Sequence, residues 1–195
     1  MQANLNRRSF IQAAAAGIGG LSAAGVCGQE KGTAAKPLRV ALIGCGGRGT
    51  TLLPEICKER VVALVDPDWR QFGEAFNKIR KAAPSADTAS IRTFADYRRL
   101  FDEMGRELDA AVIATPNHQH ALPALLAIRR GIHVYVEKPM AHTIAEVRQL
   151  REEAQKHGVV SQVGNHGHSS EGCRRLCEYL AAGAAIGRKS CGEGV

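Results

Sequence analysis

From Leu38 onward, short apolar runs alternate with helical patterns, and this alternation restricts the chain to very few folds. The apolar runs occupy residues 38–44, 60–66, 90–94, 109–115, 132–137 and 159–164, and the helical patterns occupy residues 50–59, 67–83, 95–104, 120–131, 143–158 and 170–183. Runs without polar alternation are typical of strands that are buried on both faces. The pattern therefore predicts an α/β fold with a doubly wound, mostly parallel sheet. Pro54 and Pro123 fit this assignment only in the first turn of their helices.

The connection after the first predicted strand reads GCGGRG and places Gly44, Gly46 and Gly49 in a G-x-G-x-x-G spacing. Between a strand and a helix, such glycines allow a tight turn, close approach of a pyrophosphate and close helix–strand packing. Asp66 ends the second strand, 20 residues beyond Gly46, where a carboxylate can accept hydrogen bonds from an adenosine ribose. The pattern predicts NAD binding. NADP stays an alternative cofactor, because Arg70, one helical turn further on, could bind its 2′-phosphate. A helix N-cap is the alternative role of Asp66.

The fourth predicted strand ends in ATPNHQH, residues 114–120. Ligands of open α/β sheets bind beyond the carboxyl ends of the strands, so we expect Thr115, Pro116 and Asn117 on the rim of the cofactor site. His118 and His120 have a spacing that a metal site or a helix cap can also use. With no carboxylate nearby, we interpret them as rim contacts.

The fifth predicted strand ends abruptly in Glu137, Lys138 and Pro139. On the same rim, both charged side chains are expected to point into the cleft. A lysine beside a nicotinamide can hydrogen-bond a substrate hydroxyl and take its proton as hydride leaves. Pro139 would fix the backbone that aims this lysine, and its peptide bond is a candidate for the cis form. A surface Glu–Lys pair is the alternative.

Residues 1–28 differ in composition from the rest of the chain. Arg7 and Arg8 precede Phe10 and an Ala/Gly-rich apolar run that is too short and too glycine-rich for a membrane span. The segment resembles a twin-arginine export signal, and a basic amphipathic helix is the alternative. Residues 29–37 form a polar linker. We expect export by the twin-arginine machinery, with a periplasmic or extracellular destination.

Charge and cysteine content limit the other classes of function. The formal net charge is +7, but the basic residues are dispersed without interleaved aromatics, so we expect no nucleic-acid partner. The six cysteines are irregularly spaced, which argues against a disulfide framework. Cys173 and Cys177 would share a helix face near His166 and His168, but this spacing fits no familiar zinc pattern. Buried helix cysteines and no bound metal are the favoured interpretation.

Four stretches together resemble the N-terminal domain of the Gfo/Idh/MocA oxidoreductases. They read VALIGCGGRG, VVALVDPD, AAVIATPNHQHALPALLAIRRGIHVYVEKPMAHT and GNHGHSSEG. The resemblance implies a Rossmann fold, a dinucleotide cofactor and a substrate of the sugar or polyol class. It assigns the pyrophosphate to the loop of Gly44, Gly46, Gly47, Arg48 and Gly49; the adenosine ribose to Asp66; the nicotinamide riboside to Thr115, Pro116, Asn117 and His120; the hydride-transfer site to Glu137 and the catalytic Lys138; and the nicotinamide side to Asn165.

The chain also departs from the family pattern. We expect a Rossmann domain at residues 38–164, the start of a connection to a substrate domain at residues 165–187 and an aberrant tail at residues 188–195. The family's second α/β domain, which carries the substrate pocket and the homo-oligomer interface, is expected to be missing or truncated. His166 stands where the family often has Gln. The predicted function is an exported NAD(P)-dependent oxidoreductase acting on a carbohydrate-type hydroxyl. A non-catalytic dinucleotide-binding module is the alternative.

Overall fold

The computed structural model describes residues 36–182, apart from the side chains of residues 168 and 169. Its strands are β1 (Arg39–Ile43), β2 (Arg60–Val65), β3 (Arg92–Phe94), β4 (Ala110–Ile113), β5 (His133–Glu137) and β6 (Ser161–Gly164). Its α-helices are α2 (Arg48–Ile56), α3 (Arg70–Ala82), α4 (Tyr97–Met104), α5 (Ala121–Ile128), α6 (Ile144–His157) and α7 (Glu171–Ala181). Short 3-10 helices lie at η2 (Thr88–Ser90), η3 (Gly105–Glu107), η4 (Asn117–Gln119) and η5 (His166–Ser169). The predicted export signal and the tail at residues 188–195 lie outside the described residues.

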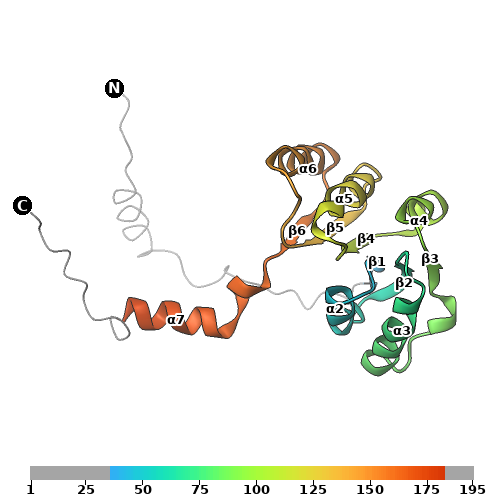
Figure 1. Cartoon of the computed structure of the whole chain (residues 1–195), viewed down its shortest axis with the longest axis horizontal. Helices are drawn as coiled ribbons and strands as arrows, with labels where there is room; N and C mark the ends of the chain where they lie inside the picture. Colours follow the sequence, from blue (N-terminus) through green and yellow to red (C-terminus); the bar gives the residue numbers. More distant parts are fainter. Residues whose placement is uncertain (1–35, 183–195) are drawn as a thin grey trace, which may run out of the picture. The chain divides into compact units, whose positions relative to one another are not determined.

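The sheet has the strand order β3-β2-β1-β4-β5-β6, and every neighbouring pair is parallel (Figure 1). The chain winds outward from β1 through β2 to β3, and then returns to the other side of β1 to continue through β4. The strand order therefore reverses between β1 and β4, where the carboxyl ends of two strands open toward loops that diverge. This topology confirms the predicted doubly wound sheet and places a ligand crevice beside β1.

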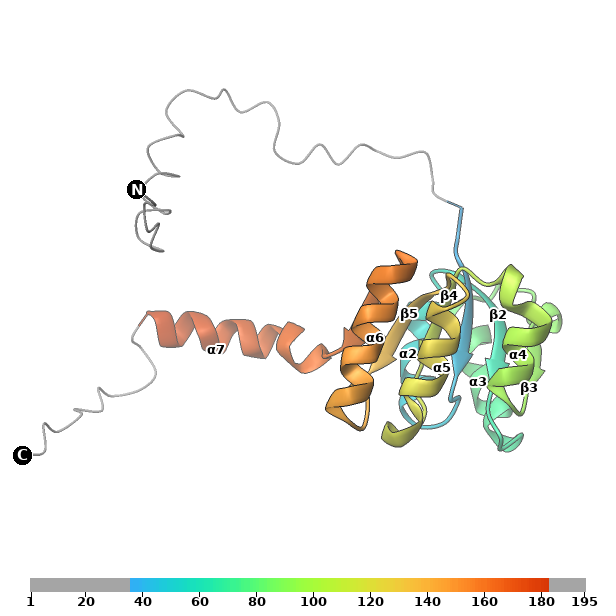
Figure 2. The same ribbon diagram turned by 90° about the horizontal axis from the view of Figure 1, so that it is seen from above.

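Two layers of helices cover the sheet, because alternate residues of each strand face opposite sides. Val40 and Leu42 of β1 pack with α2 and α3, whereas Ala41 and Ile43 pack with the cluster that includes α4, α5 and α6 (Figure 2). Both layers are apolar, which explains why the strands carry no polar alternation. Truncating a fully buried side chain such as Leu53 to alanine is expected to cost about 2–5 kcal/mol.

Two details of the helices differ from the prediction. Helix α2 begins at Arg48, two residues before the predicted start, so Pro54 falls in its last turn and not in its first. Pro54 therefore removes one i→i−4 hydrogen bond of the helix, the one that would reach the carbonyl of Thr50. Pro123 does lie in the first turn of α5. Helix α3 begins at Arg70, three residues after the predicted start at residue 67, and Trp69 just before it is 77% exposed.

The predicted burial of the helix cysteines is wrong. Helix α7 has no buried residue: Cys173 is half-buried and Cys177 is exposed. Among the described residues, no group of three or more His, Cys, Asp or Glu side chains is arranged to hold a metal ion. None of the helices between residues 36 and 182 has the length and apolar character that crossing a membrane requires.

Candidate functional site

The glycine loop joins β1 to α2 at the point where the strand order reverses. Gly44 has a φ of +91°, and a Cβ there would lie 2.7 Å from the backbone carbon of Ala114. A Cβ at Gly49 would lie 1.9 Å from the carbonyl oxygen of Gly44. The first and third glycines of the motif are thus required by backbone packing. Gly46 lines the cleft instead. No side chain caps the N-terminus of α2, which leaves first-turn backbone N–H groups, which point toward the loop, without a side-chain acceptor.

Asp66 follows the last residue of β2 and is bonded to the glycine loop. Its Oδ2 accepts a hydrogen bond from the backbone N–H of Cys45 over 2.9 Å, and its Oδ1 accepts one from that of Asp68 over 2.9 Å. The alternative role as a helix cap is not realised, because α3 begins only at Arg70. Arg70 itself is paired with Asp68 at 2.8 Å. The Asp68 carboxylate has a pKa lowered to about 2, chiefly by its hydrogen bond with the Arg70 side chain.

Cys45, between the first two glycines, is a buried thiol. Burial raises its pKa to about 12, and the negative charge of Asp66 acts in the same direction. The thiol therefore stays protonated and unreactive at neutral pH.

A cleft of about 650 Å³ lies along the carboxyl ends of the strands next to this loop. It is lined by residues from five segments: Ile43, Gly44, Gly46, Val65, Asp66, Pro67, Gln71, Ala95, Asp96, Tyr97, Arg98, Ala114, Thr115, Pro116 and Gln119. Five of the predicted cofactor residues thus line the same cleft: Gly44, Gly46, Asp66, Thr115 and Pro116. Gln71, Tyr97 and Arg98 were not predicted. The end of the weak strand β3 at Phe94 is the signal that could have identified the last two.

The turn after β4 contributes Thr115 and Pro116 to the cleft, while Asn117 is exposed. The side-chain oxygen of Thr115 is buried and has no hydrogen-bond partner. A buried hydroxyl without a partner is uncommon in native proteins. A bound molecule with polar groups in the cleft would satisfy it.

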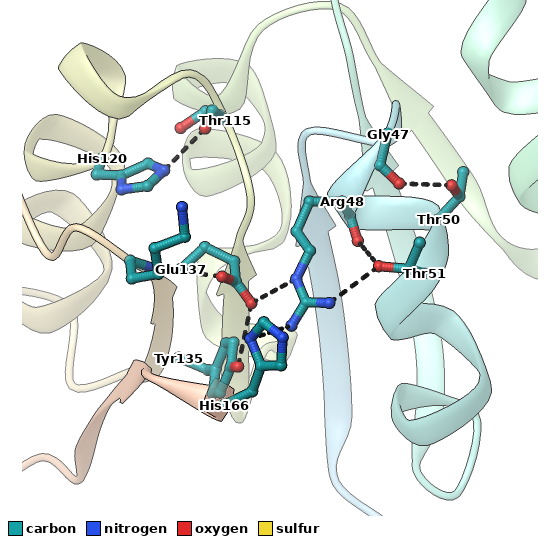
Figure 3. Close-up of polar contacts among 10 residues, drawn as sticks. Gly47, Arg48, Thr50, Thr51, Thr115, His120, Tyr135, Glu137 and His166 are labelled. Atoms are coloured by element: carbon teal, nitrogen blue, oxygen red, sulfur yellow. Dashed lines mark hydrogen bonds and ion pairs between the residues drawn. The ribbon is translucent and has the colours of Figure 1, made fainter. Parts of the chain in front are cut away.

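His120 does not lie on the rim, contrary to the prediction. It is 1% exposed, and its ring lies beside the backbone carbonyl of Thr115 in the turn after β4 (Figure 3). Nδ1 lies 2.6 Å from the carbonyl oxygen of Pro139, and Nε2 lies 2.7 Å from that of Thr115. A neutral imidazole donates one hydrogen bond, so the tautomer decides which of the two carbonyls accepts it, and the ring packs against both loops. His120 therefore holds the turn after β4 against the loop after β5, and His118 is exposed.

The two charges at the end of β5 have different environments. Glu137 is only 3% exposed, so the expectation that it points into the cleft is wrong. Its Oε1 accepts hydrogen bonds from Nε of Arg48 over 2.9 Å and from the hydroxyl of Tyr135 over 3.2 Å. Burial raises the pKa of Tyr135, as does the negative charge of Glu137. Lys138 is exposed at the edge of the sheet, and the Lys138–Pro139 bond is cis, as expected.

Arg48 is bonded to protein groups in the structure, although it was predicted to hold the pyrophosphate. Besides Glu137, its guanidinium donates to the hydroxyl of Thr51 and lies 3.4 Å from Nδ1 of His166 (Figure 3). His166 and the exposed Asn165 directly follow β6. The predicted residues at the ends of β1, β5 and β6 therefore meet around Arg48.

The strand order, the glycine loop and the cleft beside Asp66 define a dinucleotide-binding domain of the Rossmann type. Gly44 and Gly49 leave no room for a Cβ, and the Thr115 hydroxyl has no hydrogen-bond partner. Both features fit a dinucleotide with polar groups near the loop. Residues 38–165 match the sequence model of a family described as "Oxidoreductase family, NAD-binding Rossmann fold". The chain belongs to this Gfo/Idh/MocA oxidoreductase family, as its motifs indicated, and its cofactor is NAD.

Curated proteins are similar to this chain over about two thirds of its length. The chain is 34% identical over 140 residues to a "Glycosyl hydrolase family 109 protein" of Stenotrophomonas maltophilia, covering 68% of this chain and 29% of the relative. It is 28% identical over 134 residues to a "2,7-anhydro-N-acetylneuraminate hydratase" of Mediterraneibacter gnavus, covering 67% of this chain and 32% of the relative. The chain thus spans about a third of the length of these two relatives.

Solved structures share the fold. Myo-inositol 2-dehydrogenase of Lactobacillus plantarum superposes with a TM-score of 0.63 at 24% identity, covering 76% of this chain and 42% of that one. Scyllo-inositol dehydrogenase of Lactobacillus casei, solved with NAD(H) and scyllo-inositol, superposes with a TM-score of 0.60 at 19% identity, covering 76% and 42%. A dehydrogenase of Chromobacterium violaceum is 28% identical with a TM-score of 0.59, covering 75% and 41%.

Proposed function

We propose that this chain supplies the NAD-binding half of an oxidoreductase that moves a hydride to or from a sugar or polyol hydroxyl carbon. The observation that carries the proposal is the arrangement at the sheet edge. The cleft that Gly46, Asp66 and Thr115 line ends at the turn after β4, and β5, whose end carries Lys138, is the next strand. Two of the similar structures are dehydrogenases of inositols, which are cyclic polyols, and this supports the substrate class.

The residues divide the work between binding and proton transfer. When bound, NAD accepts or supplies the hydride. The glycine loop and the N-terminus of α2 bind its pyrophosphate, and the carboxylate of Asp66 accepts hydrogen bonds from the adenosine ribose. The ammonium of Lys138 hydrogen-bonds the substrate oxygen, and its amine form takes the hydroxyl proton during oxidation. In the reverse direction Lys138 returns that proton.

The test begins with binding. NAD and NADP are titrated into the full chain by calorimetry, because Trp69 is 77% exposed and does not line the cleft, which makes its fluorescence a weak reporter. We expect saturable binding that favours NAD. A folded chain that binds neither dinucleotide would refute the proposal.

Turnover is tested next, by NADH formation with a panel of sugars and cyclic polyols. Lys138→Gln should abolish turnover while NAD binding stays intact. Lys156→Gln, an exposed lysine on α6, is the matched control and should leave both unchanged. NAD binding without turnover on any panel member would favour a non-catalytic dinucleotide-binding module.

The names of two relatives favour a second candidate function. One is called a glycosyl hydrolase and the other a hydratase, and neither reaction changes the net oxidation state of its substrate. Some glycoside hydrolases do depend on NAD. In that case the same cleft and Lys138 would serve a carbohydrate substrate without accumulation of NADH. Release of a sugar product at constant NADH absorbance distinguishes this function from a dehydrogenase.

We further propose that residues 1–28 direct export through the twin-arginine machinery, a route that carries folded proteins and suits an enzyme loaded with cofactor beforehand. The Arg7–Arg8 pair ahead of the apolar run supports this. Replacing both arginines by lysine should retain the protein in the cytoplasmic fraction. Unchanged fractionation of the double variant would exclude this pathway.

A further inference from the structure

Glu137 is a carboxylate that the protein has enclosed. It lies at the last position of β5 with 3% of its surface exposed, and three groups of the chain donate hydrogen bonds to it. A charge in such a place is unfavourable unless a counter-charge and hydrogen bonds accompany it. The side chain has almost no exposed surface and is not among the residues that line the cleft. Its function must be carried out through the groups that it binds.

The counter-charge comes from the helix that follows the glycine loop. Arg48 is the first residue of α2, directly after the glycine loop, and its Nε lies 2.9 Å from Oε1 of Glu137. The rest of its guanidinium is also placed by protein groups, the hydroxyl of Thr51 and the ring of His166 (Figure 3). If Arg48 moved to a phosphate, Glu137 would become a buried carboxylate without a cation, which is strongly destabilising. The geometry therefore favours Glu137 over the cofactor as the partner of Arg48.

Strand β6 packs closely against the Glu137 carboxylate. A Cβ at Gly164 of β6 would lie 2.6 Å from the Tyr135 hydroxyl oxygen and 2.8 Å from Cδ of Glu137. The backbone of β6 thus closes directly over the carboxylate, and the glycine is what allows the close approach. Gly164 has no counterpart among the predicted site residues, because a glycine at a strand end gives no signal of what packs against it.

From these contacts we infer that Arg48 is a positioning residue for Lys138, acting through Glu137. Oε2 of Glu137 accepts a hydrogen bond from the backbone N–H of Lys138 over 3.3 Å, so the carboxylate that Arg48 fixes in turn fixes the backbone from which the lysine projects. The inference rests on the proposed role of Lys138 in proton transfer. It connects the loop that binds the cofactor to the residue that handles the substrate proton.

The experiment records two quantities on the full chain: the NAD dissociation constant by calorimetry, and the exchange rate and chemical shift of the Lys138 backbone amide by ¹⁵N NMR. The variants are Arg48→Gln, Glu137→Gln and the double variant. Lys58→Gln is the matched control, since it removes one positive charge just beyond the C-terminal end of α2, from an exposed pair with Glu55.

The expected result separates positioning from cofactor binding. Arg48→Gln should leave the NAD dissociation constant within about threefold, while the Lys138 amide exchanges about tenfold faster because its acceptor is no longer held. Glu137→Gln should change the exchange rate of the same amide. The double variant should change this rate no more than a single variant does, because both substitutions break the same contacts from Arg48 through Glu137 to Lys138. Lys58→Gln should change neither quantity.

Two results would overturn the inference. The first is a loss of NAD affinity above about tenfold in Arg48→Gln with an unchanged Lys138 amide, which identifies a phosphate ligand. The second applies if Arg48→Gln does not fold, and then Arg48→Lys, which keeps a cation for Glu137, is measured instead. Arg48→Lys should fold, bind NAD as tightly as the wild type and show a Lys138 amide exchange rate between those of the folded Lys58→Gln control and Glu137→Gln. A failure on either quantity counts against the inference. A wild-type chain that does not bind NAD refutes the proposed function instead, and does so before any variant is compared.

Discussion

Oδ2 of Asp66 accepts a hydrogen bond over 2.9 Å from the backbone N–H of Cys45, and so the end of β2 is tied to the glycine loop after β1. The same carboxylate accepts from the N–H of Asp68 and lines the cleft. Asp66 therefore shapes the glycine loop by its hydrogen bond. In the proposed function it also presents acceptor oxygens to the adenosine ribose, and a sequence motif does not separate these two roles.

Asp66→Asn should weaken NAD binding by about ten- to a hundredfold, because a charged acceptor is replaced by an amide whose NH₂ group also faces a backbone donor. The preference for NAD over NADP should shrink as the negative charge is lost. Calorimetric titration with both dinucleotides checks this. Asp68→Asn is the control on the same turn, since Asp68 pairs with Arg70 and does not line the cleft. Equal losses in the two variants would contradict the specific role of Asp66.

The glycines of the loop should respond differently to alanine. Gly49→Ala forces a methyl group against the carbonyl of Gly44, where a Cβ would be 1.9 Å away, and we expect destabilisation of about 3 kcal/mol or more. At Gly46 the nearest group is the flexible end of Gln71, 3.1 Å away, so the fold should survive with a change below about 1 kcal/mol.

The methyl group of Gly46→Ala nevertheless enters the cleft, and NAD affinity should fall at least about tenfold. Urea denaturation and calorimetry separate the two effects. If Gly46→Ala were to bind NAD as tightly as the wild type, the pyrophosphate could not lie against this glycine.

The sequence predicted the sheet well because the central strands β1 and β4 are covered on both faces, whereas the edge strands β3 and β6 are largely exposed. Apolar runs such as residues 38–44 then stand out from the helical patterns between them. The reversal of strand order between β1 and β4 was not predicted. The cleft residues Gly44, Asp66 and Thr115 were predictable because they follow the strand ends directly, and a parallel sheet brings its carboxyl ends to one edge.

The errors concern side chains whose partners are distant in sequence. His120 is buried because the carbonyl of Pro139, 19 residues away, lies beside it. Glu137 is buried because Arg48, 89 residues earlier, reaches it. A polar residue at a strand end is equally compatible with a cleft and with a buried network. Only the tertiary arrangement decides between them, and no local pattern records that arrangement.

His120 should contribute to the free energy of unfolding through its contacts with two backbone carbonyls. His120→Leu keeps a similar volume but removes the ring nitrogens beside the carbonyls of Thr115 and Pro139. Since a neutral imidazole has one N–H donor, one buried acceptor loses its partner at a cost of about 1–3 kcal/mol. Urea denaturation measures this. The exposed His118→Leu is the control and should stay within about 0.5 kcal/mol of the wild type. Similar midpoints for the two variants would mean that the ring does not hold the two loops together.

The start of α6 gives a prediction about acid stability. Glu146 forms a capping box with Thr143: its Oε2 accepts from the backbone N–H of Thr143 over 2.8 Å, and the Thr143 hydroxyl accepts from the backbone N–H of Glu146 over 3.2 Å. The hydrogen bond from the Thr143 backbone is the main cause that lowers the pKa of Glu146 below its ordinary value of 4.5.

A carboxylate whose pKa is lower in the folded state contributes stability that is fully present above its unfolded value, about 4.5, and is lost as the pH falls through the folded value. Glu146→Gln should therefore lower the urea midpoint at pH 7 and leave the difference from wild type smaller at acid pH. Glu152→Gln, an exposed carboxylate in the middle of α6, is the control and should give a pH-independent difference. If the difference in urea midpoint between Glu146→Gln and the wild type grows on acidification, its sign does not fit a capping carboxylate. The start of α6 then does not contribute to the acid sensitivity of the fold.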